Sequence, residues 1–246
     1  MTWHNGPMCP FDTESTGVDT SADRIVSACA GRVGVPGEPP RLTTWLVNPG
    51  VPIPQGATAI HGITDEMALA GQPPAEALDA LADDLCDAMR SGVPVVGWNV
   101  VFDLSLLRSE LARHGLPSLE TRLGRAIGPV VDGLLLDKQH DRYRRGGRRL
   151  GDVAAHFGVA TDGAHSAEGD ALCAARTVWK IANAYPALAA MSLDELHAAQ
   201  ITWAREQAAS FISYLQSKNK PYDDVDGSWP IRIDPVAPAS DELPPF

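Results

Sequence analysis

The stretch Phe11-Asp12-Thr13-Glu14-Ser15-Thr16-Gly17 places two carboxylates two residues apart, in a segment predicted to be a β-strand that runs into a Thr-Gly turn. Residues i and i+2 of a strand point to the same face, so Asp12 and Glu14 should project together, about 7 Å apart along the strand. Burying two like charges is costly, and a divalent cation between them removes the conflict. Carboxylate oxygens suit Mg²⁺ or Mn²⁺. The alternative is a pair of solvated acids at an exposed strand end, and only further ligands elsewhere in the chain distinguish the two.

Size and composition indicate one well-cored globular domain, with or without an appendage, in the 246 residues of the chain. The net charge of −11 by itself argues against a nucleic-acid binder, although the local charge at a site matters more than the total. No run of eighteen apolar residues is present and the first residues lack signal-peptide features, so neither a membrane span nor export is expected. Four cysteines without paired spacing (Cys9, Cys29, Cys86 and Cys173) are predicted to be reduced core thiols of a cytoplasmic protein.

The first fifty residues have a different pattern from the later part of the chain. After the opening strand, for which Pro10 is expected to be the first residue, residues 25–33 and 41–47 read as two further strands joined by short turns. Such a series predicts an antiparallel meander. Short helical turns are expected at 57–61 and 64–70. Later, short strands at 93–97 and 128–132 alternate with helices, which are expected at 73–89, 99–114, 150–157 and 165–185. Alternation favours parallel pairing of the last two strands, so we expect an α/β fold: a five-stranded mixed sheet flanked by helices.

Three further residues of the right chemistry lie in the second half of this pattern. Asp103 follows a short strand and stands one helical turn after Asn99, which places both on one helix face. Asp170 falls early in a long helix, where it can point back toward the sheet, and His165 lies in the loop before that helix. An acid in the first turn of a helix is commonly a surface residue favoured by the helix dipole, so each fragment alone says little.

Three patterns follow one another along the chain: F-D-x-E-x-T-G at 11–17, N-x-x-x-D at 99–103 and H-x4-D at 165–170. In this order they resemble the three motifs of the DEDDh (DnaQ-like) 3′→5′ exonucleases. The segment from Asn48-Pro49 to Ile60-His61-Gly62-Ile63-Thr64 is similar to the proofreading epsilon subunit of DNA polymerase III. The resemblance covers residues 8–185. Ser15 departs from it where threonine is common, and residues 187–246 have no counterpart in it.

This resemblance implies an RNase H-like fold and hydrolysis of the phosphodiester at a DNA 3′ end with two divalent cations, Mg²⁺ or Mn²⁺. Asp12, Glu14 and Asp170 would hold the cation that carries the attacking water, and Asp12 would bridge to a second cation. Asp103 would hold the waters of that second cation. His165 would take the proton, since imidazole titrates near neutral pH.

The expected substrate contacts are more numerous. They are Thr13, Thr16 and Gly17 under the 3′ nucleotide, Ile60 and His61 against the last base, Asn99, and Phe102 as a stacking face or a core residue. A basic island at 138–149 adds Arg144, Arg145 and Arg148, either as a clamp for the phosphates of the incoming strand or as a solvated flexible loop.

The chain is expected to divide into a catalytic domain, residues 1–186, and a helical extension, residues 187–246. A capping box, Ser192-x-x-Glu195, opens a helix predicted over 192–217, and a Pro/Asp-rich tail begins at residue 221. The partner implied is a nucleic acid with a free 3′ end, in the first place single-stranded DNA, and a DNA polymerase or a second copy of the chain is a further candidate. Two alternatives stay open: an exoribonuclease of the RNase T or oligoribonuclease type, and a catalytically silent nucleic-acid-binding module.

Overall fold

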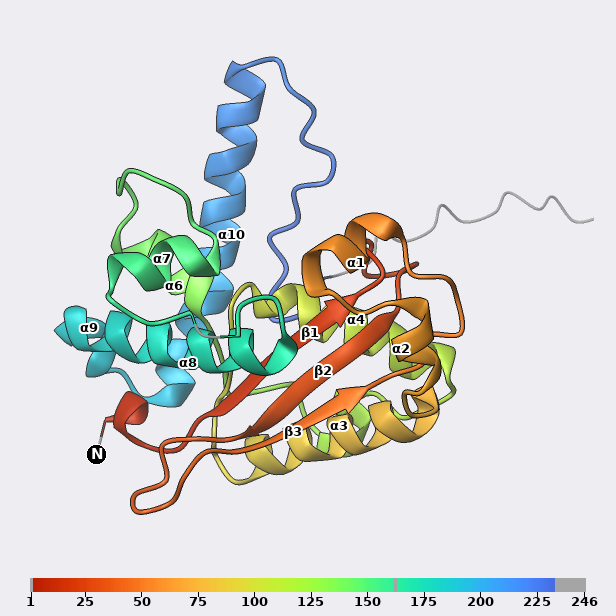
Figure 1. The fold of residues 1–246 in the computed structure, drawn as a ribbon. Helices are drawn as coiled ribbons and strands as arrows, with labels where there is room; N and C mark the ends of the chain where they lie inside the picture. Colours follow the sequence, from red (N-terminus) through yellow and green to blue (C-terminus); the bar gives the residue numbers. More distant parts are fainter. Residues whose placement is uncertain (1, 162, 233–246) are drawn as a thin grey trace, which may run out of the picture.

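A five-stranded mixed sheet forms the centre of the molecule, in a computed structural model that describes residues 2–161 and 163–232 (Figure 1). The strands are β1 (Cys9–Ser15), β2 (Ile25–Arg32), β3 (Arg41–Leu46), β4 (Val95–Gly97) and β5 (Val130–Asp132), in the order β3-β2-β1-β4-β5. β1, β2 and β3 pair antiparallel, whereas β4 pairs parallel with both β1 and β5. The mixed sheet expected from the sequence is therefore confirmed.

Helices surround this sheet, and three of them were not expected. The helices are α1 (Gln55–His61), α2 (Asp65–Leu69), α3 (Pro74–Arg90), α4 (Val100–Arg113), α5 (Leu119–Leu123), α6 (Gly133–His140), α7 (Leu150–His156), α8 (Ala167–Ala184), α9 (Pro186–Ala189) and α10 (Leu193–Ser217), after a 3₁₀ turn at Trp3–Asn5. The unexpected helices are α5, α6 and the single turn α9. Side-chain caps open the first two, from Ser118 and Asp132 respectively, and all three are too short to show a long apolar stripe.

Alternation along the strands builds a core on each face of the sheet. Val95 and Val130 belong to the cluster that includes the apolar residues of α3 and α4, whereas Val96 and Val131 pack with residues of α6 and α8. Figure 1 shows α8 in front of the sheet and α3 along its other side. All four cysteines are unpaired and buried, as expected. No helix in the described part of the chain is long and apolar enough to cross a bilayer.

The expectation that Pro10 is the first residue of the first strand is wrong. Pro10 is the second residue of β1, the central strand of the sheet. The backbone N–H of Cys9 donates to the carbonyl of Pro94, next to β4, and the register with β2 begins one residue later, at Phe11 opposite Ala30. A bridge pairs Met8 with Val33 before the proline, so the ladder between β1 and β2 passes Pro10 with one donor missing.

The first half of α10 is part of the sheet's packing. The Gln200 side chain accepts a hydrogen bond from the Asp132 N–H at 2.8 Å and donates to the Val130 carbonyl at 2.9 Å, so it continues the hydrogen bonding of the edge strand β5. His197 Nδ1 accepts from the Val130 N–H at 3.2 Å. Leu196 joins the core with residues of α8. Packing is continuous across residue 186, where the sequence suggested a boundary.

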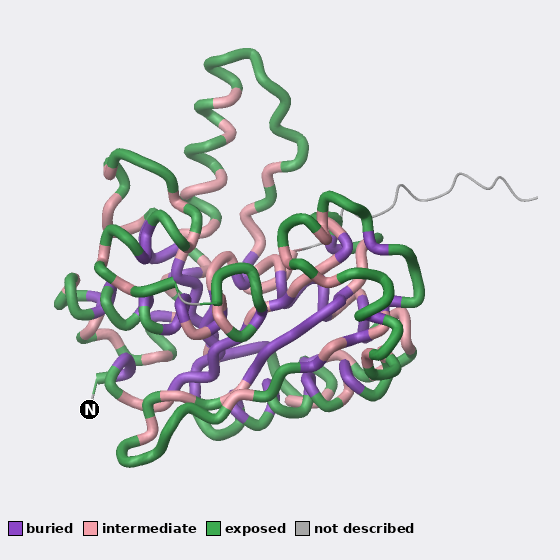
Figure 2. Tube along the Cα trace, viewed as in Figure 1, coloured by how far each residue is buried: buried purple, intermediate pink, exposed green. Residues whose placement is uncertain are grey.

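The second half of α10 rises away from the sheet and the chain returns beside it through residues 219–232 (Figures 1 and 2). Residues 221–232 contain no helix or strand. The remainder of the predicted Pro/Asp-rich tail, residues 233–246, lies outside the described residues.

Candidate active site

Three carboxylates meet where the end of β1 faces the start of α8. Asp12, Glu14 and Asp170 each offer an oxygen, and these atoms all lie within 4.8 Å of one another. Asp12 and Glu14 share one face of β1, as the two-residue period of a strand requires. Asp170 lies in the first turn of α8, which contacts β1. Residues 158 positions apart in the chain therefore form one cluster of hard oxygen donors.

Local features of the backbone fix this meeting point. The β1–β2 register shifts between Glu14 and Ser15, an irregularity of the kind that re-aims side chains beside active sites. Ser166 caps α8 by accepting a hydrogen bond from the Gly169 N–H. A Cβ at Gly169 would lie 2.1 Å from the Gly163 carbonyl oxygen, so only glycine lets the preceding loop pack against the helix start.

Asp103, the fourth acid, is held beside this cluster by Thr13. One oxygen of the buried Asp103 carboxylate accepts from the Thr13 backbone N–H at 3.0 Å and from the Thr13 hydroxyl at 2.6 Å. The expectation that the Thr13 backbone binds the 3′ nucleotide is not supported, because its N–H already donates to Asp103. Thr13 instead positions an acid.

The pKa values of the four acids reflect a concentration of uncompensated negative charge. Burial raises the pKa of Asp12 well above its usual value, and the neighbouring Asp103, Glu14 and Asp170 raise it further. Burial, with a contribution from Asp170, raises the pKa of Glu14 to about 7, and burial raises that of Asp103 to about 7. The pKa of Asp170 is also raised by burial. The charges that act on Asp12 are all negative, and oxygen ligands around such an excess fit a divalent cation.

His165 lies at the edge of the acid cluster. Its side chain is exposed, its φ of 66° is left-handed, and its backbone N–H donates to the Asp170 carboxylate at 3.2 Å. The backbone is thus tied to a cluster acid while the imidazole faces solvent.

Asn99 precedes α4 in a left-handed conformation, with φ of 62°. Its backbone N–H donates at 3.0 Å to the carboxylate of Asp132, which also accepts from the Leu134 N–H and so caps α6. Asp132 was expected only as the last residue of a strand, without a role at the site. It could have been found from its position, because it ends β5, and β5 pairs with β4, the strand that precedes Asn99.

The turn after β1 is closed by hydrogen bonds among its own residues. The Thr16 hydroxyl donates to Asp23 at 2.7 Å and accepts from the Arg24 N–H at 3.0 Å. A Cβ at Gly17 would lie 2.5 Å from the Asp23 carboxylate, so a larger residue there would displace the Asp23 side chain from Thr16. Sequence analysis missed Asp23. Thr16 and Gly17 lie beside the site, but the Thr16 side chain is committed to this turn.

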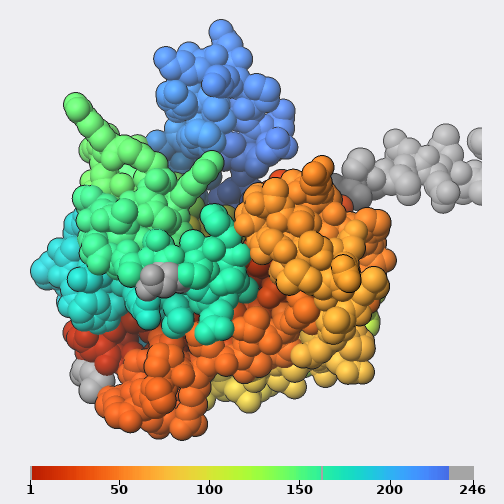
Figure 3. All heavy atoms as spheres, viewed as in Figure 1, coloured from red at the N-terminus to blue at the C-terminus, as the bar shows by residue number. Residues whose placement is uncertain are grey.

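The α1 segment forms the opposite wall of a hollow above β1. In Figure 3 the atoms of residues around 60 and those around 165 stand on either side of it, with β1 at its floor. Ile60 is 62% exposed, whereas His61 accepts the Ile63 N–H through Nδ1 at 3.0 Å, and burial lowers its pKa against a backbone hydrogen bond with Ser15 of β1 that raises it. Phe102 is half-buried and packs against the main core, as one of its two expected roles required.

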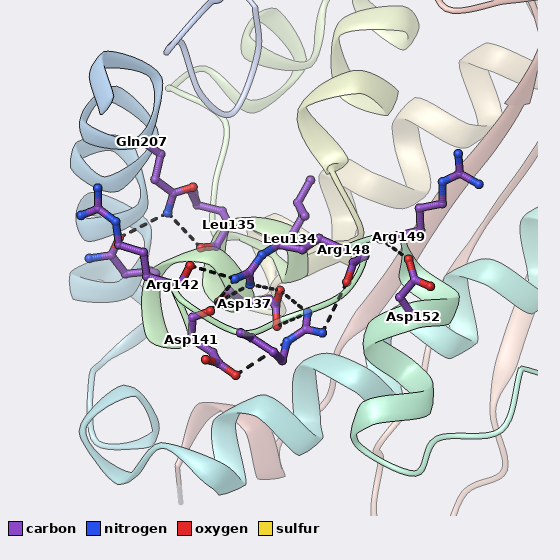
Figure 4. A network of polar contacts seen from close by, with 12 residues as sticks. Leu134, Leu135, Asp137, Asp141, Arg142, Arg148, Arg149, Asp152 and Gln207 are labelled. Atoms are coloured by element: carbon purple, nitrogen blue, oxygen red, sulfur yellow. Dashed lines mark hydrogen bonds and ion pairs between the residues drawn. The ribbon is translucent and has the colours of Figure 1, made fainter. Parts of the chain in front are cut away.

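Three arginines of the basic island were expected to bind phosphates or to be solvated, and two of them, Arg144 and Arg148, are arranged for neither. Arg144 and Arg148 contact the buried carboxylate of Asp137 at 2.9 and 2.5 Å, and their side chains are only 9% and 18% exposed (Figure 4). The carbonyl of Arg148 accepts from the indole N–H of Trp98 at 3.2 Å. The clamp expectation is therefore not supported for Arg144 and Arg148, whereas the Arg145 side chain is exposed.

Comparison with known proteins agrees with this geometry. A family model described as exonuclease, of the RNase T group, matches residues 10–178, which span β1 to most of α8. The chain belongs to the exonuclease family. It is a nuclease, a hydrolase of the DnaQ-like type that the three motifs resembled.

The curated relatives are much longer proteins. The PolC-type DNA polymerase III of Streptococcus thermophilus is 27% identical over 170 residues, which are 69% of this chain and 11% of the relative. The protein of that name from Streptococcus pneumoniae is 26% identical over the same shares. The chain thus corresponds to about a tenth of the length of these relatives.

Solved structures agree in fold. An exonuclease I structure superposes with a TM-score of 0.63 at 20% identity, over 74% of this chain and 42% of that one. Exonuclease I from Methylocaldum szegediense gives a TM-score of 0.61 at 22% identity over the same shares. These neighbours confirm the RNase H-like fold.

Proposed function

We propose that this protein is a 3′→5′ exonuclease that removes nucleoside monophosphates from the 3′ ends of single-stranded DNA. The observation that carries the proposal is the convergence of Asp12, Glu14 and Asp170 within 4.8 Å, beside Asp103 and His165. A catalytically silent module would be expected to have lost one of these five side chains, and none is lost.

Two divalent cations, Mg²⁺ or Mn²⁺, are the cofactors that this set of oxygens would hold. Asp12, Glu14 and Asp170 would bind one, and Asp12 with Asp103 would serve the other. When bound, such cations stabilise the attacking and leaving oxygens of an in-line displacement at phosphorus. The raised pKa values of the acids support this role, because a bound cation offsets the repulsion that otherwise favours their protonated forms.

The remaining side chains would bind and transfer protons. His165 would accept the proton of the attacking water, since its exposed ring is free to turn while its backbone stays on Asp170. His61 lies against Ser15 of β1, and the exposed Ile60 beside it offers an apolar surface to the terminal base. Asn99 and Phe102 lie at the start of α4, next to Asp103.

The choice of DNA rests on the relatives. The curated relatives are DNA polymerases, and one solved neighbour is E. coli exonuclease I in complex with a dT13 oligonucleotide. An exoribonuclease would share the same acids, because the difference lies in how a 2′-hydroxyl is accommodated.

The test is a comparison of product ladders. The protein is incubated with Mn²⁺ and 5′-labelled single-stranded DNA, RNA of the same sequence, and duplex DNA with a matched or mismatched 3′ end. We expect a ladder of one-nucleotide steps on single-stranded DNA that chelation and Asp12→Ala both abolish. Hydrolysis that survives Asp12→Ala would contradict the assignment of the active site. Faster degradation of RNA than of DNA would mean that RNA, and not DNA, is the substrate.

A role in proofreading or repair beside a DNA polymerase extends this proposal. It is supported by the polymerase relatives, and it predicts that the mismatched duplex end is degraded faster than the matched one. Equal rates on the two ends would count against it.

A further inference from the structure

A cavity of about 770 Å³ lies outside the acid cluster, between α10, α6 and the returning segment at 224–232. The exposed second half of α10 forms one side and the returning chain the other, so the two together form an arch, which we define as residues 204–232 (Figures 1 and 2). Asn99, which precedes the α4 helix that carries Asp103, is among the residues that line the cavity. The cavity therefore shares one residue with the N-x-x-x-D motif of the candidate active site.

Both feet of the arch are fixed to the catalytic domain. Gln200 holds α10 on β5. The other foot is held by the Arg232 N–H, which donates to the Ser105 hydroxyl of α4 at 2.9 Å, and by the buried Trp229, whose ring centroid lies 4.9 Å from that of His197. The two sides of the arch touch near its base, where a Cβ at Gly227 would lie 3.0 Å from the Ala208 Cβ and 3.1 Å from the Arg205 Cα, so the cavity is a groove between α6 and the arch and not a passage through the arch.

The walls of the cavity differ in chemistry. α10 contributes Phe211 and Tyr214, which are 51% and 54% exposed, with ring centroids 6.4 Å apart and planes inclined by only 14°. The facing wall contributes the exposed cations Lys138 and Arg142, and Arg142 reaches across to the Ser210 hydroxyl of α10 at 2.8 Å. Acidic residues also line the cavity, Asp224 and Asp226 on the returning segment, Glu206 on α10 and the buried Asp132 at the start of α6, so phosphates are favoured only beside Lys138 and Arg142.

We propose that the groove between α6 and the arch binds the single-stranded 5′ continuation of the DNA whose 3′ end is hydrolysed at the acid cluster; this rests on the proposed function. Bases stack on Phe211 and Tyr214, and phosphates follow Lys138 and Arg142. Aromatic stacking combined with a basic track is how proteins bind single strands without regard to sequence. An apolar face made for a second copy would not need cations opposite its aromatic rings.

The test compares a short and a long substrate. kcat/KM is measured for single-stranded DNA of about 3 and about 15 nucleotides, lengths below and near the upper site sizes of single-strand-binding grooves. We expect the long substrate to be preferred by the wild-type protein, and the ratio of the two values to fall at least tenfold in Phe211→Ala/Tyr214→Ala, through KM. Phe211→Leu/Tyr214→Leu keeps apolar side chains, guards against loss of folding, and should lower the ratio similarly. Trp179→Ala removes an exposed aromatic ring from α8, outside this cavity, and should keep the ratio within twofold.

Binding separates this inference from the function on which it rests. Anisotropy of a labelled 15-mer is measured with Asp12→Asn, alone and combined with the α10 substitutions. If the wild-type protein degrades no DNA, the proposed function fails, while weaker binding in the combined variant still supports the groove as a DNA site. An unchanged ratio and unchanged binding overturn the inference. Self-association that the α10 substitutions abolish, with the ratio unchanged, would assign the aromatic rings to a second copy instead.

Discussion

Two groups of acids in this molecule have opposite surroundings. Asp137 is buried, and the guanidinium groups of Arg144 and Arg148 compensate its charge within the chain (Figure 4). Asp12 is also withdrawn from solvent, but the groups that act on it are three further acids, and its pKa is raised. A compensated charge holds two segments together. An uncompensated one stores repulsion that an external cation relieves, so the second group is the one suited to chemistry.

The largest effect that distinguishes the two groups is expected from Asp12→Asn. Activity on single-stranded DNA should fall on the order of 10³-fold, because the cation site loses the acid shared by both cations. At the same time the metal-free variant should melt at a higher temperature than wild type at pH 8, since one of four repelling charges is removed. Calorimetry in chelator and single-turnover kinetics measure the two effects. A variant that loses activity and also loses stability without metal would contradict the repulsion.

The matched change in the other group is Asp137→Asn, and it should act in the reverse sense. Removing one partner of a buried ion pair typically costs about 3–5 kcal/mol, because the arginines are left without their counter-charge. We therefore expect a lower midpoint in urea unfolding. Mn²⁺ affinity, followed by titration calorimetry below the unfolding temperature, should not change. If folded Asp137→Asn binds Mn²⁺ more weakly than the wild-type protein, the charge of Asp137 influences the cation site.

How far sequence could predict these groups depends on the spacing of their members. Asp12 and Glu14 are two residues apart on a strand, so the period of the strand alone places them together. The antiparallel pairing of the first three strands and the parallel pairing of the last two also follow from turn lengths and from the change to alternating strands and helices. Asp103 and Asp170 joined them only through the resemblance of three motifs, since no local rule brings residues 91 or 158 positions after Asp12 to the same point.

The basic island shows where such reasoning stops. Five arginines within eight residues favour a phosphate clamp or a solvated loop, but the sequence does not show which guanidinium groups turn inward. Arg144 and Arg148 do so because α6, which was not expected, presents Asp137 beneath them. The expected boundary at residue 186 has the same weakness. Nothing local to Gln200 shows that its amide completes the hydrogen bonding of β5, some seventy residues earlier.

A smaller effect is expected at the residue that links Thr13 to the fourth acid. Thr13→Val keeps the strand backbone and its N–H bond to Asp103 but removes the hydroxyl donor at 2.6 Å. Residues that orient metal ligands typically contribute 10–100-fold, so kcat/KM should fall by about that factor. Thr13→Ser restores the donor and should restore most of the activity. If serine fails while the protein stays folded, the methyl group and not the hydroxyl holds Asp103.

The smallest effect is a dependence of stability on pH that a cation should reverse. The pKa of Glu14 and that of Asp103 are raised to about 7 in the folded protein, from ordinary values of 4.5 and 3.8. The folded state therefore binds more protons than the unfolded state between about pH 4 and 7, and stability falls as pH rises through this window. Without metal, the melting temperature should drop by a few degrees between pH 5.5 and pH 8. Mn²⁺ binds the deprotonated acids, so the rise in melting temperature that it produces should be larger at pH 8 than at pH 5.5. Asp137→Asn should show the same difference between the two pH values, whereas Asp12→Asn should reduce it; if both variants reduce it equally, the acids near β1 are not its source.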